Sequence, residues 1–208
     1  MRASGMQLTT RRAAIVGGVA AVATLAAAVT LRKSGERAGA PAVYHITLPE
    51  GESVPLRQFA AALVTSDPPK PVPAIRFTSR DGKPETIGDF AGKGVVLNLW
   101  ATWCAPCDAE LPSLDALAAR LEPAGIVVVP LSSDREGAGA IEAYYRAHGI
   151  AHLGIWLDPD GGVISALGAR GIPTTLIVDR QGRERGRLEG GIDWNGDAPV
   201  DAIRKLIG

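Results

Sequence analysis

The sequence predicts an α/β domain that follows an apolar segment at the N-terminus, and three observations indicate this class. From residue 74 onward, short apolar runs typical of strands alternate with helical patterns, as expected of a sheet flanked by helices. Hydrophobic residues make up 46% of the 208 residues, enough for a packed core and too many for a chain disordered throughout. Basic and acidic residues number 22 each, so the charge balance does not favour a nucleic-acid partner.

The N-terminal part of the chain has the composition of a membrane anchor. Residues 13–31 are 19 consecutive uncharged residues, and a helix of that length spans roughly the 30 Å of a bilayer core. We expect residues 1–12 to lie in the cytoplasm and residues 13–31 to form a single-pass transmembrane signal-anchor. The alternative is a cleaved signal, which would leave a soluble protein outside the cytoplasm. Either interpretation sends the rest of the chain out of the cytoplasm.

Residues 32–71 are predicted to be a stalk and linker between the anchor and a domain at 72–208. Residues 43–48 are typical of a short strand, and residues 56–63 of one or two helical turns. Prolines crowd residues 66–73, and because they lack a backbone N–H and favour extended backbone, they indicate a semi-rigid linker.

The elements of the α/β domain follow in order along the chain. A hairpin is predicted around the turn at Asp81-Gly82, because such a pair favours a tight reversal between two strands. The near-continuous apolar run at 95–100 predicts a central strand covered on both faces. The remaining predictions are helices at 105–122, 138–148, 162–167 and 200–207, strands at 126–131 and 155–157, and a second hairpin of 174–178 with 183–188.

The chemistry of the chain centres on its two cysteines, Cys104 and Cys107, at the junction between the strand at 95–100 and the helix at 105–122. The N–H groups and dipole at a helix N-terminus stabilise an anion, and thiol pKa values at such sites fall from about 8.5 to roughly 3.5–7.5. Cys107 lies one turn further on, close enough to form a disulfide with Cys104. Pro106 is tolerated in a first helical turn. The pattern indicates dithiol–disulfide exchange.

Two further features bear on this site. Pro173 follows Ile172 immediately before a predicted strand, where it can hold a cis peptide bond. Glu110 comes three residues after Cys107, on the helix face near the two sulfurs. If buried, its carboxyl would exchange a proton with Cys107; otherwise it is an ordinary exposed helical glutamate, and both readings stay open.

The motif TWCAPC at 102–107, with Glu110 and Pro112 after it and RGIPTT at 170–175, resembles the thioredoxin superfamily. Within that superfamily the chain is similar to the membrane-anchored TlpA/ResA-type thiol:disulfide reductases over about residues 72–208. The resemblance implies a thioredoxin-like fold: a central mixed sheet flanked by helices, with an N-terminal hairpin extension and a central strand–helix insertion.

The resemblance also implies roles for individual residues. Cys104 would attack a substrate disulfide, Cys107 would resolve the mixed disulfide, and Glu110 would handle the proton. Residues at substrate-contacting positions are Trp103, Pro106, Ile172 and the cis-proline Pro173. The Ala105-Pro106 pair inside the motif is uncharged where relatives often carry charge, which leaves partner choice and redox poise open.

The same resemblance implies a cellular location and partners for the domain. It implies a periplasmic domain that reduces disulfides in partner proteins, commonly for cytochrome c maturation or for copper-centre assembly in oxidases. A membrane electron donor would re-reduce the dithiol. We expect no cofactor other than the redox-active disulfide itself, no metal ion and no nucleic acid.

Three alternatives use the same cysteines. With His148 and His152 they could form a zinc site, although 40 residues separate Cys107 from His148, against about 12–15 in the usual finger. Two thiolates could hold Cu(I), and a single reactive cysteine could support a thiol peroxidase. A purely structural disulfide is disfavoured, because so short a loop gives little entropic stabilisation.

Overall fold

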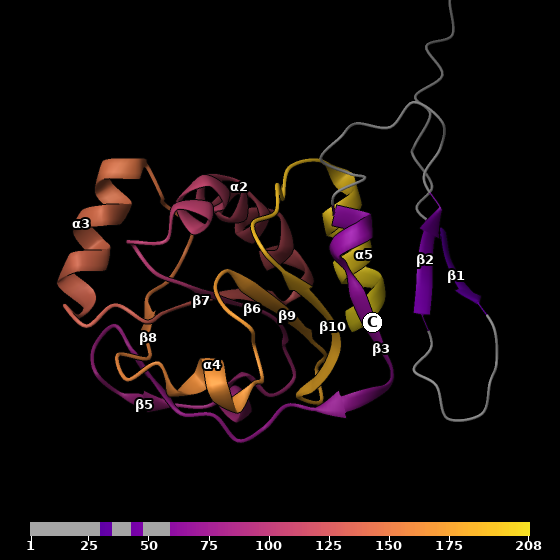
Figure 1. Ribbon diagram of the computed structural model, residues 1–208, viewed down its shortest axis with the longest axis horizontal. Helices are drawn as coiled ribbons and strands as arrows, with labels where there is room; N and C mark the ends of the chain where they lie inside the picture. The colour runs from indigo at the N-terminus through magenta and orange to yellow at the C-terminus, as the bar shows by residue number, and fades with distance from the viewer. Residues whose placement is uncertain (1–29, 35–42, 48–58) are drawn as a thin grey trace, which may run out of the picture.

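The computed structural model describes residues 30–34, 43–47 and 59–208, and its arrangement is shown in Figure 1. Strands β1 (Thr30–Ser34) and β2 (Val43–Thr47) pair as an antiparallel hairpin, and β2 confirms the strand predicted at 43–48. The predicted anchor lies outside the described residues except for Thr30 and Leu31, which belong to β1. Within the described ranges, no helix is long and apolar enough to cross a membrane.

The domain is built on one mixed sheet of eight strands in the order β3-β10-β9-β6-β7-β8-β4-β5. The central strands β6, β7 and β8 are parallel to one another, while β9 pairs antiparallel with β6 and β10 antiparallel with β9. The strands are β3 (Val64–Pro71), β4 (Phe77–Ser79), β5 (Pro84–Glu85), β6 (Gly94–Trp100), β7 (Ile126–Ser132), β8 (Trp156–Leu157), β9 (Thr174–Val178) and β10 (Arg183–Glu189).

Helices cover both faces of this sheet, as the sequence predicted. In Figure 1, α2 and α5 lie on one side and α4 on the other. The helices are α2 (Ala105–Leu121), α3 (Ala138–His148), α4 (Gly162–Ala166) and α5 (Asp197–Ile207), with short 3₁₀ turns η1 (Ile87–Phe90) and η2 (Glu122–Ala124). Each predicted hairpin, strand and helix of residues 74–208 is present; α3 and β9 have the predicted bounds, and the ends of the other elements are shifted.

Alternation along β6 divides the core into two clusters. Val96 and Trp100 pack with the leucines of α2 and with α5, while Leu97 and Leu99 face the cluster that includes Val163 of α4. All seven residues of β6 are buried, so the strand that leads to the cysteines is fixed on both sides. The end of β6 is therefore a rigid support for the CxxC turn.

The proline-rich segment is part of the sheet, which corrects its interpretation as a linker. Residues 64–71 form β3, which pairs antiparallel with β10 at the outer edge of the sheet. Proline favours extended backbone in a linker and in a strand alike, and an edge strand tolerates its missing N–H. A helical turn at 59–62 precedes β3, and the fully buried Phe59 packs edge-on against Trp194 with ring centroids 6.0 Å apart. The sheet thus begins at Val64, before the predicted boundary at residue 72.

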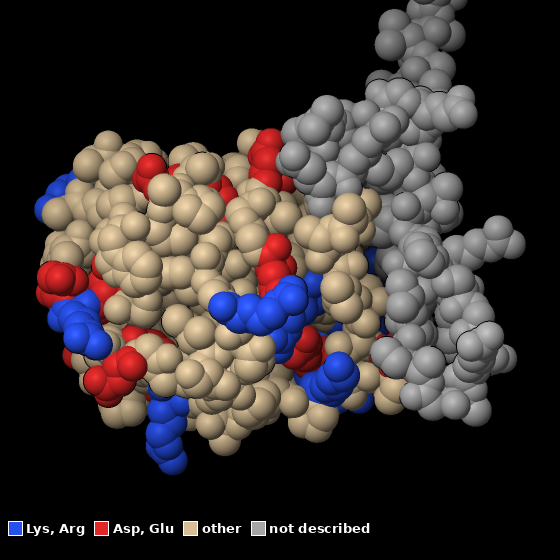
Figure 2. Space-filling model, viewed as in Figure 1, with Lys and Arg blue, Asp and Glu red and all other residues tan. Residues whose placement is uncertain are grey.

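Figure 2 shows how charged side chains are distributed on one face of the domain. On the face drawn in Figure 2, basic and acidic residues are interspersed among uncharged ones over the described part of the chain. This distribution matches the balanced composition and places no extended field of one sign on that face.

Candidate redox site around Cys104 and Cys107

The two cysteines form a disulfide at the N-terminus of α2, with their Cα atoms 5.2 Å apart. Cys104 is the N-cap residue of α2 and has extended backbone, and its carbonyl accepts a hydrogen bond from Asp108 N at 3.0 Å. Cys104 is 6% exposed, whereas Cys107 is completely buried. A partner can therefore reach only the first sulfur from solvent, and that sulfur lies where the helix N-terminus stabilises a thiolate.

Trp103 stands directly before this disulfide and is 71% exposed, unusual for so large an apolar side chain. It lines a cavity of about 390 Å³ together with residues that follow β7 and residues 159–164. Pro106, also exposed, lies on the other side of Cys104 in the sequence. Apolar surface at the mouth of the site is what a site for protein partners needs.

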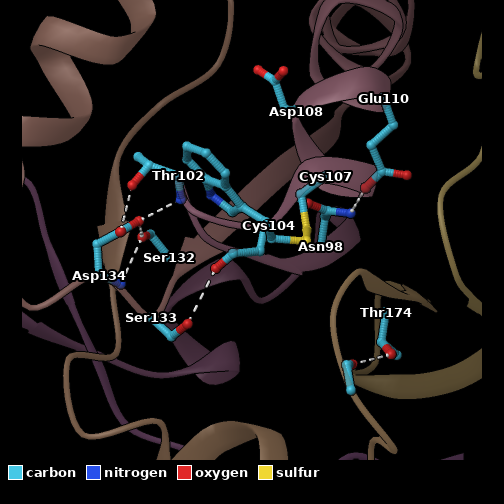
Figure 3. The surroundings of a disulfide bond; sticks show 12 residues. Asn98, Thr102, Cys104, Cys107, Asp108, Glu110, Ser132, Ser133, Asp134 and Thr174 are labelled. Carbon is cyan, nitrogen blue, oxygen red and sulfur yellow. Dashed lines mark hydrogen bonds between the residues drawn. A yellow bond between two sulfur atoms is a disulfide. The ribbon is translucent and has the colours of Figure 1, made fainter.

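The predicted cis peptide bond between Ile172 and Pro173 is confirmed. Pro173 is buried, and its carbonyl accepts a hydrogen bond from Gly190 N at 2.9 Å. Thr174, the next residue, is among the groups that surround the disulfide in Figure 3. The structure therefore brings the cis-proline loop to the cysteines, although the two segments are far apart in the sequence.

Residues 190–194 form a segment that runs beside the N-terminal part of α2. A Cβ added to Gly191 would lie 3.0 Å from the carbonyl oxygen of Pro106, so the two backbones approach closely. Further along, Trp194 N donates to Ser113 Oγ at 3.1 Å, and Ser113 Oγ donates to the carbonyl of Glu110 at 2.8 Å. The segment is thus fixed to the helix by backbone contacts and by a serine bridge.

Glu110 is buried, only 2% exposed, which excludes its reading as an ordinary surface glutamate. Its Oε1 accepts a hydrogen bond from Asn98 Nδ2 at 2.8 Å, and its Oε2 accepts one from Ile192 N at 2.9 Å. Burial raises the pKa of Glu110 to about 7, and the two hydrogen bonds oppose that rise. The indole N–H of Trp194 also lowers this pKa, although it makes no hydrogen bond within the usual limits. The carboxyl is poised to exchange a proton near neutral pH.

Sequence reasoning missed Asn98, which connects Glu110 to the sheet. It lies on β6, is completely buried, and donates from Nδ2 to Glu110 and to Thr175 Oγ1, the latter at 2.9 Å. The signal was present, because Asn98 is the one polar residue in the apolar run at 95–100. A buried amide needs hydrogen-bond partners, so a polar residue in a central strand indicates a network.

Asp134 was also missed, and it organises the turn before the cysteines. It is 2% exposed and accepts hydrogen bonds from Thr102 N at 2.9 Å and from Thr102 Oγ1 at 2.7 Å. Ser132 Oγ donates to the same carboxylate at 2.6 Å, and Figure 3 shows the three side chains together. The loop after β7 therefore holds the Thr102–Trp103 turn in place.

The histidines of the zinc alternative do not join the cysteines. His148 stacks on Tyr144 with ring centroids 3.9 Å apart, and its Nε2 lies 3.4 Å from Asp108 Oδ1. The backbone N of His152 donates to Asp115, and both cysteines are in the disulfide. Among the described residues, no three His, Cys, Asp or Glu side chains are grouped as metal ligands. The geometry gives the zinc reading no support.

A disulfide at the start of a helix, next to a central strand and a cis-proline loop, defines a thiol-disulfide oxidoreductase with a thioredoxin-like fold. Residues 68–185 match the model of the AhpC/TSA family, and the chain belongs to that family. Curated relatives are named as thiol-disulfide oxidoreductases and thiol:disulfide interchange proteins. This similarity identifies the chain as an enzyme of thiol–disulfide exchange.

Two relatives illustrate the sequence similarity. The thiol-disulfide oxidoreductase ResA of Bacillus thuringiensis subsp. konkukian is 29% identical over 121 residues, which cover 58% of this chain and 69% of the relative. The thiol:disulfide interchange protein DsbE of Pseudomonas fluorescens biotype C is 34% identical over 125 residues, covering 60% of this chain and 67% of the relative. Both alignments cover more than half of the chain.

Solved structures agree on the fold. A putative DsbE from Chlorobium tepidum superposes with a TM-score of 0.58 at 23% identity, covering 67% of this chain and 97% of that one. The exposed lipoprotein thioredoxin Etrx1 of Streptococcus pneumoniae gives a TM-score of 0.53 at 26% identity, covering 64% of this chain and 98% of that one. The predicted thioredoxin-like fold is thereby confirmed.

Proposed function

We propose that this oxidoreductase works as a reductant of disulfides in partner proteins, with Cys104 as the attacking thiol and Cys107 as the resolving thiol. The observation that carries the assignment is the unequal exposure of the pair: Cys104 keeps a small accessible area and Cys107 keeps none. Cys104 also has the N-cap position, where its thiolate is stabilised.

The reaction transfers two electrons and two protons to the substrate. The Cys104 thiolate attacks one sulfur of the substrate disulfide, the substrate S–S bond breaks, and the first substrate thiolate leaves and takes up a proton. Cys107 then loses its proton and attacks the Cys104 sulfur of the mixed disulfide. The Cys104–Cys107 bond forms, and the second substrate thiolate leaves and is protonated.

Glu110 serves as the proton acceptor for Cys107 in this scheme. Its raised pKa, about 7, lets the carboxylate accept a proton and release it again near neutral pH. Trp103 and Pro106 are exposed and flank Cys104 in the sequence, and these two residues, together with Ile172 and Pro173, are proposed to contact the substrate.

The proposed setting is the periplasmic face of the inner membrane. Residues 13–31 would tether the domain there, or be cleaved from it, and a membrane donor would return the oxidised pair to the dithiol. The partners would be disulfide-bearing proteins of cytochrome c or oxidase copper-centre assembly. Support for this setting comes from the apolar N-terminal run and from the sequence similarity to the relatives named ResA and DsbE.

Trapping of mixed disulfides tests the assignment of the two thiols. In the full chain, Cys107→Ala is expected to accumulate covalent complexes with partner proteins, because the remaining thiol attacks and nothing resolves the product. Cys104→Ala is expected to trap little, since its one thiol is buried. Nonreducing electrophoresis measures both. Equal trapping by the two variants, or rapid peroxide turnover by Cys107→Ala, would contradict this function.

The reduction potential of the Cys104–Cys107 couple tests the direction. Equilibration against a defined thiol buffer is expected to give a value at or below the thioredoxin value of about −270 mV. A value near that of DsbA, about −120 mV, would make the protein an oxidant instead.

A further inference from the structure

One buried atom beside the disulfide has no hydrogen-bond partner. Asn98 is completely buried, and its Nδ2 donates to Glu110 and Thr175, yet its Oδ1 accepts no hydrogen bond from any residue that the structure describes. Buried acceptors in native proteins are nearly always paired, and an exception calls for an explanation such as a role in redox or catalysis. In the oxidised protein, two hydrogen bonds orient the amide through its Nδ2.

In the oxidised protein the two sulfurs beside Asn98 offer no hydrogen-bond donor. With Cys104 and Cys107 joined, neither sulfur carries hydrogen. Reduction creates an S–H group on Cys107, whose side chain has no access to water. In Figure 3 the amide of Asn98 lies between the disulfide and the carboxyl of Glu110. Reduction therefore adds a buried donor to a site that holds a buried acceptor without a partner among the described residues.

We propose that Asn98 is a positioning residue that links Cys107 to Glu110: its Oδ1 accepts the Cys107 S–H in the reduced enzyme while its Nδ2 holds the Glu110 carboxylate. The inference rests on the proposed roles of Cys107 and Glu110. It explains how Cys107 and Glu110, both on α2, are held in position for proton transfer. In the proposal, both bind the side chain of Asn98, which lies on the central strand β6.

The same amide fits the state that follows proton transfer. The proton leaves Cys107 Sγ and joins Glu110, giving a thiolate and a neutral carboxyl with no change in electron count. A half-turn about the Cβ–Cγ bond of Asn98 then presents N–H to the thiolate and C=O to the carboxyl O–H. The Thr175 hydroxyl can accept or donate, so it stays bonded in either orientation.

Among the described residues, no charged side chain contributes to the pKa of Glu110. The groups that face its carboxyl are Asn98 from β6, Ile192 N and the indole of Trp194, all neutral. Asp108, on the same helix, is bonded instead to Tyr144 of α3. A change in the proton affinity of Glu110 on substitution of Asn98 therefore reports on residue 98 itself.

The test uses Cys104→Ser in the full chain, which leaves one thiol because the sequence has two cysteines. The infrared S–H stretching band of Cys107 is compared with and without Asn98→Leu, a replacement of similar shape with no polar atoms. The expected result is a shift to higher frequency in Asn98→Leu, since a donating S–H absorbs at lower frequency. The matched control Thr175→Val removes the other partner of the amide and is expected to leave the band in place.

A second variant separates the two contacts and guards against misfolding of the first. Asn98→Asp keeps an acceptor for the S–H but loses the N–H donor to Glu110. It is expected to keep the low-frequency band and to raise the pH at which Glu110 titrates, followed in the oxidised protein by NMR of ¹³C-labelled glutamate. Glu110→Gln identifies the signal by removing it.

A band that stays unchanged in Asn98→Leu would overturn the inference, because Cys107 would then be bonded to a carbonyl of its own helix. An unchanged Glu110 titration in Asn98→Asp would do the same. Neither measurement involves turnover or a partner. Loss of mixed-disulfide trapping by Cys107→Ala would therefore refute the proposed function while leaving these two results standing.

Discussion

Glu110 loses almost all contact with water on folding, and its pKa rises because no charge replaces that water. Asn98 and Ile192 N compensate in part by donating to the two carboxylate oxygens. The balance leaves a group that neither stays ionised nor stays neutral at neutral pH. Such a group suits proton exchange, and it also makes folding stability depend on pH.

Glu110→Gln is expected to remove a pH-dependent loss of stability in the oxidised protein. Between pH 4.5 and about 7 the folded carboxyl keeps its proton while the unfolded one loses it, so raising the pH favours the unfolded state. At about 1.4 kcal/mol per pKa unit, the free energy of unfolding falls by about 3 kcal/mol across this window. Urea titrations at several pH values measure it.

A glutamate at the exposed end of the same helix provides the control. Glu122→Gln is expected to keep the wild-type pH dependence, because the side chain remains in water. If Glu110→Gln and wild type lost stability in parallel between pH 4.5 and 7, the raised pKa of Glu110 would be refuted.

At the scale of elements, the site forms where four segments meet: the end of β6, the start of α2, the cis-proline loop before β9 and the segment 190–194. The first two could be predicted because they are contiguous, and the change from an apolar run to a helical pattern marks their junction. The segment 190–194 could not be predicted, since its contacts are mostly backbone N–H groups that any residue offers. Asn98 and Asp134 were missed because one polar residue does not reveal its distant partner.

Ser113→Ala is expected to lower the free energy of unfolding by about 1–3 kcal/mol, the cost of a buried donor left without its acceptor. The serine accepts from Trp194 N and so ties the segment 190–194 to α2. Chemical denaturation measures the loss. Ser165→Ala, at an exposed position of α4, is the control and should change stability by less than about 0.5 kcal/mol. Equal effects of the two variants would show that the bridge contributes nothing.

At the scale of the whole molecule, the sheet extends further toward the N-terminus than sequence reasoning placed it. Composition, the alternation of strands and helices and the motifs predicted the domain from residue 72 onward. They did not predict β3, because prolines make linkers and edge strands look alike in a sequence. The fully buried Phe59 adds a core residue that packs on Trp194, within the segment that binds Glu110.

A chain that begins at residue 72 is therefore expected to be less stable than one that begins at residue 55. Loss of a buried phenylalanine alone costs about 3–5 kcal/mol, and β3 adds its pairing with β10. At about 2–4 °C per kcal/mol, the melting temperature should fall by about 10 °C. Calorimetry of the two oxidised proteins measures both melting temperatures. Equal values would show that residues 59–71 do not stabilise the domain and act only as a linker.

The edge position of β3 also affects whether the sheet can pair with a strand of another chain. Its prolines 68, 69 and 71 have no N–H to offer, and Pro84 lies in β5, the two-residue strand at the opposite edge of the sheet. Unpaired edge donors are what a second chain needs in order to extend a sheet, and proline removes them. The prolines at the two edges therefore protect the sheet against edge-to-edge aggregation with a second chain.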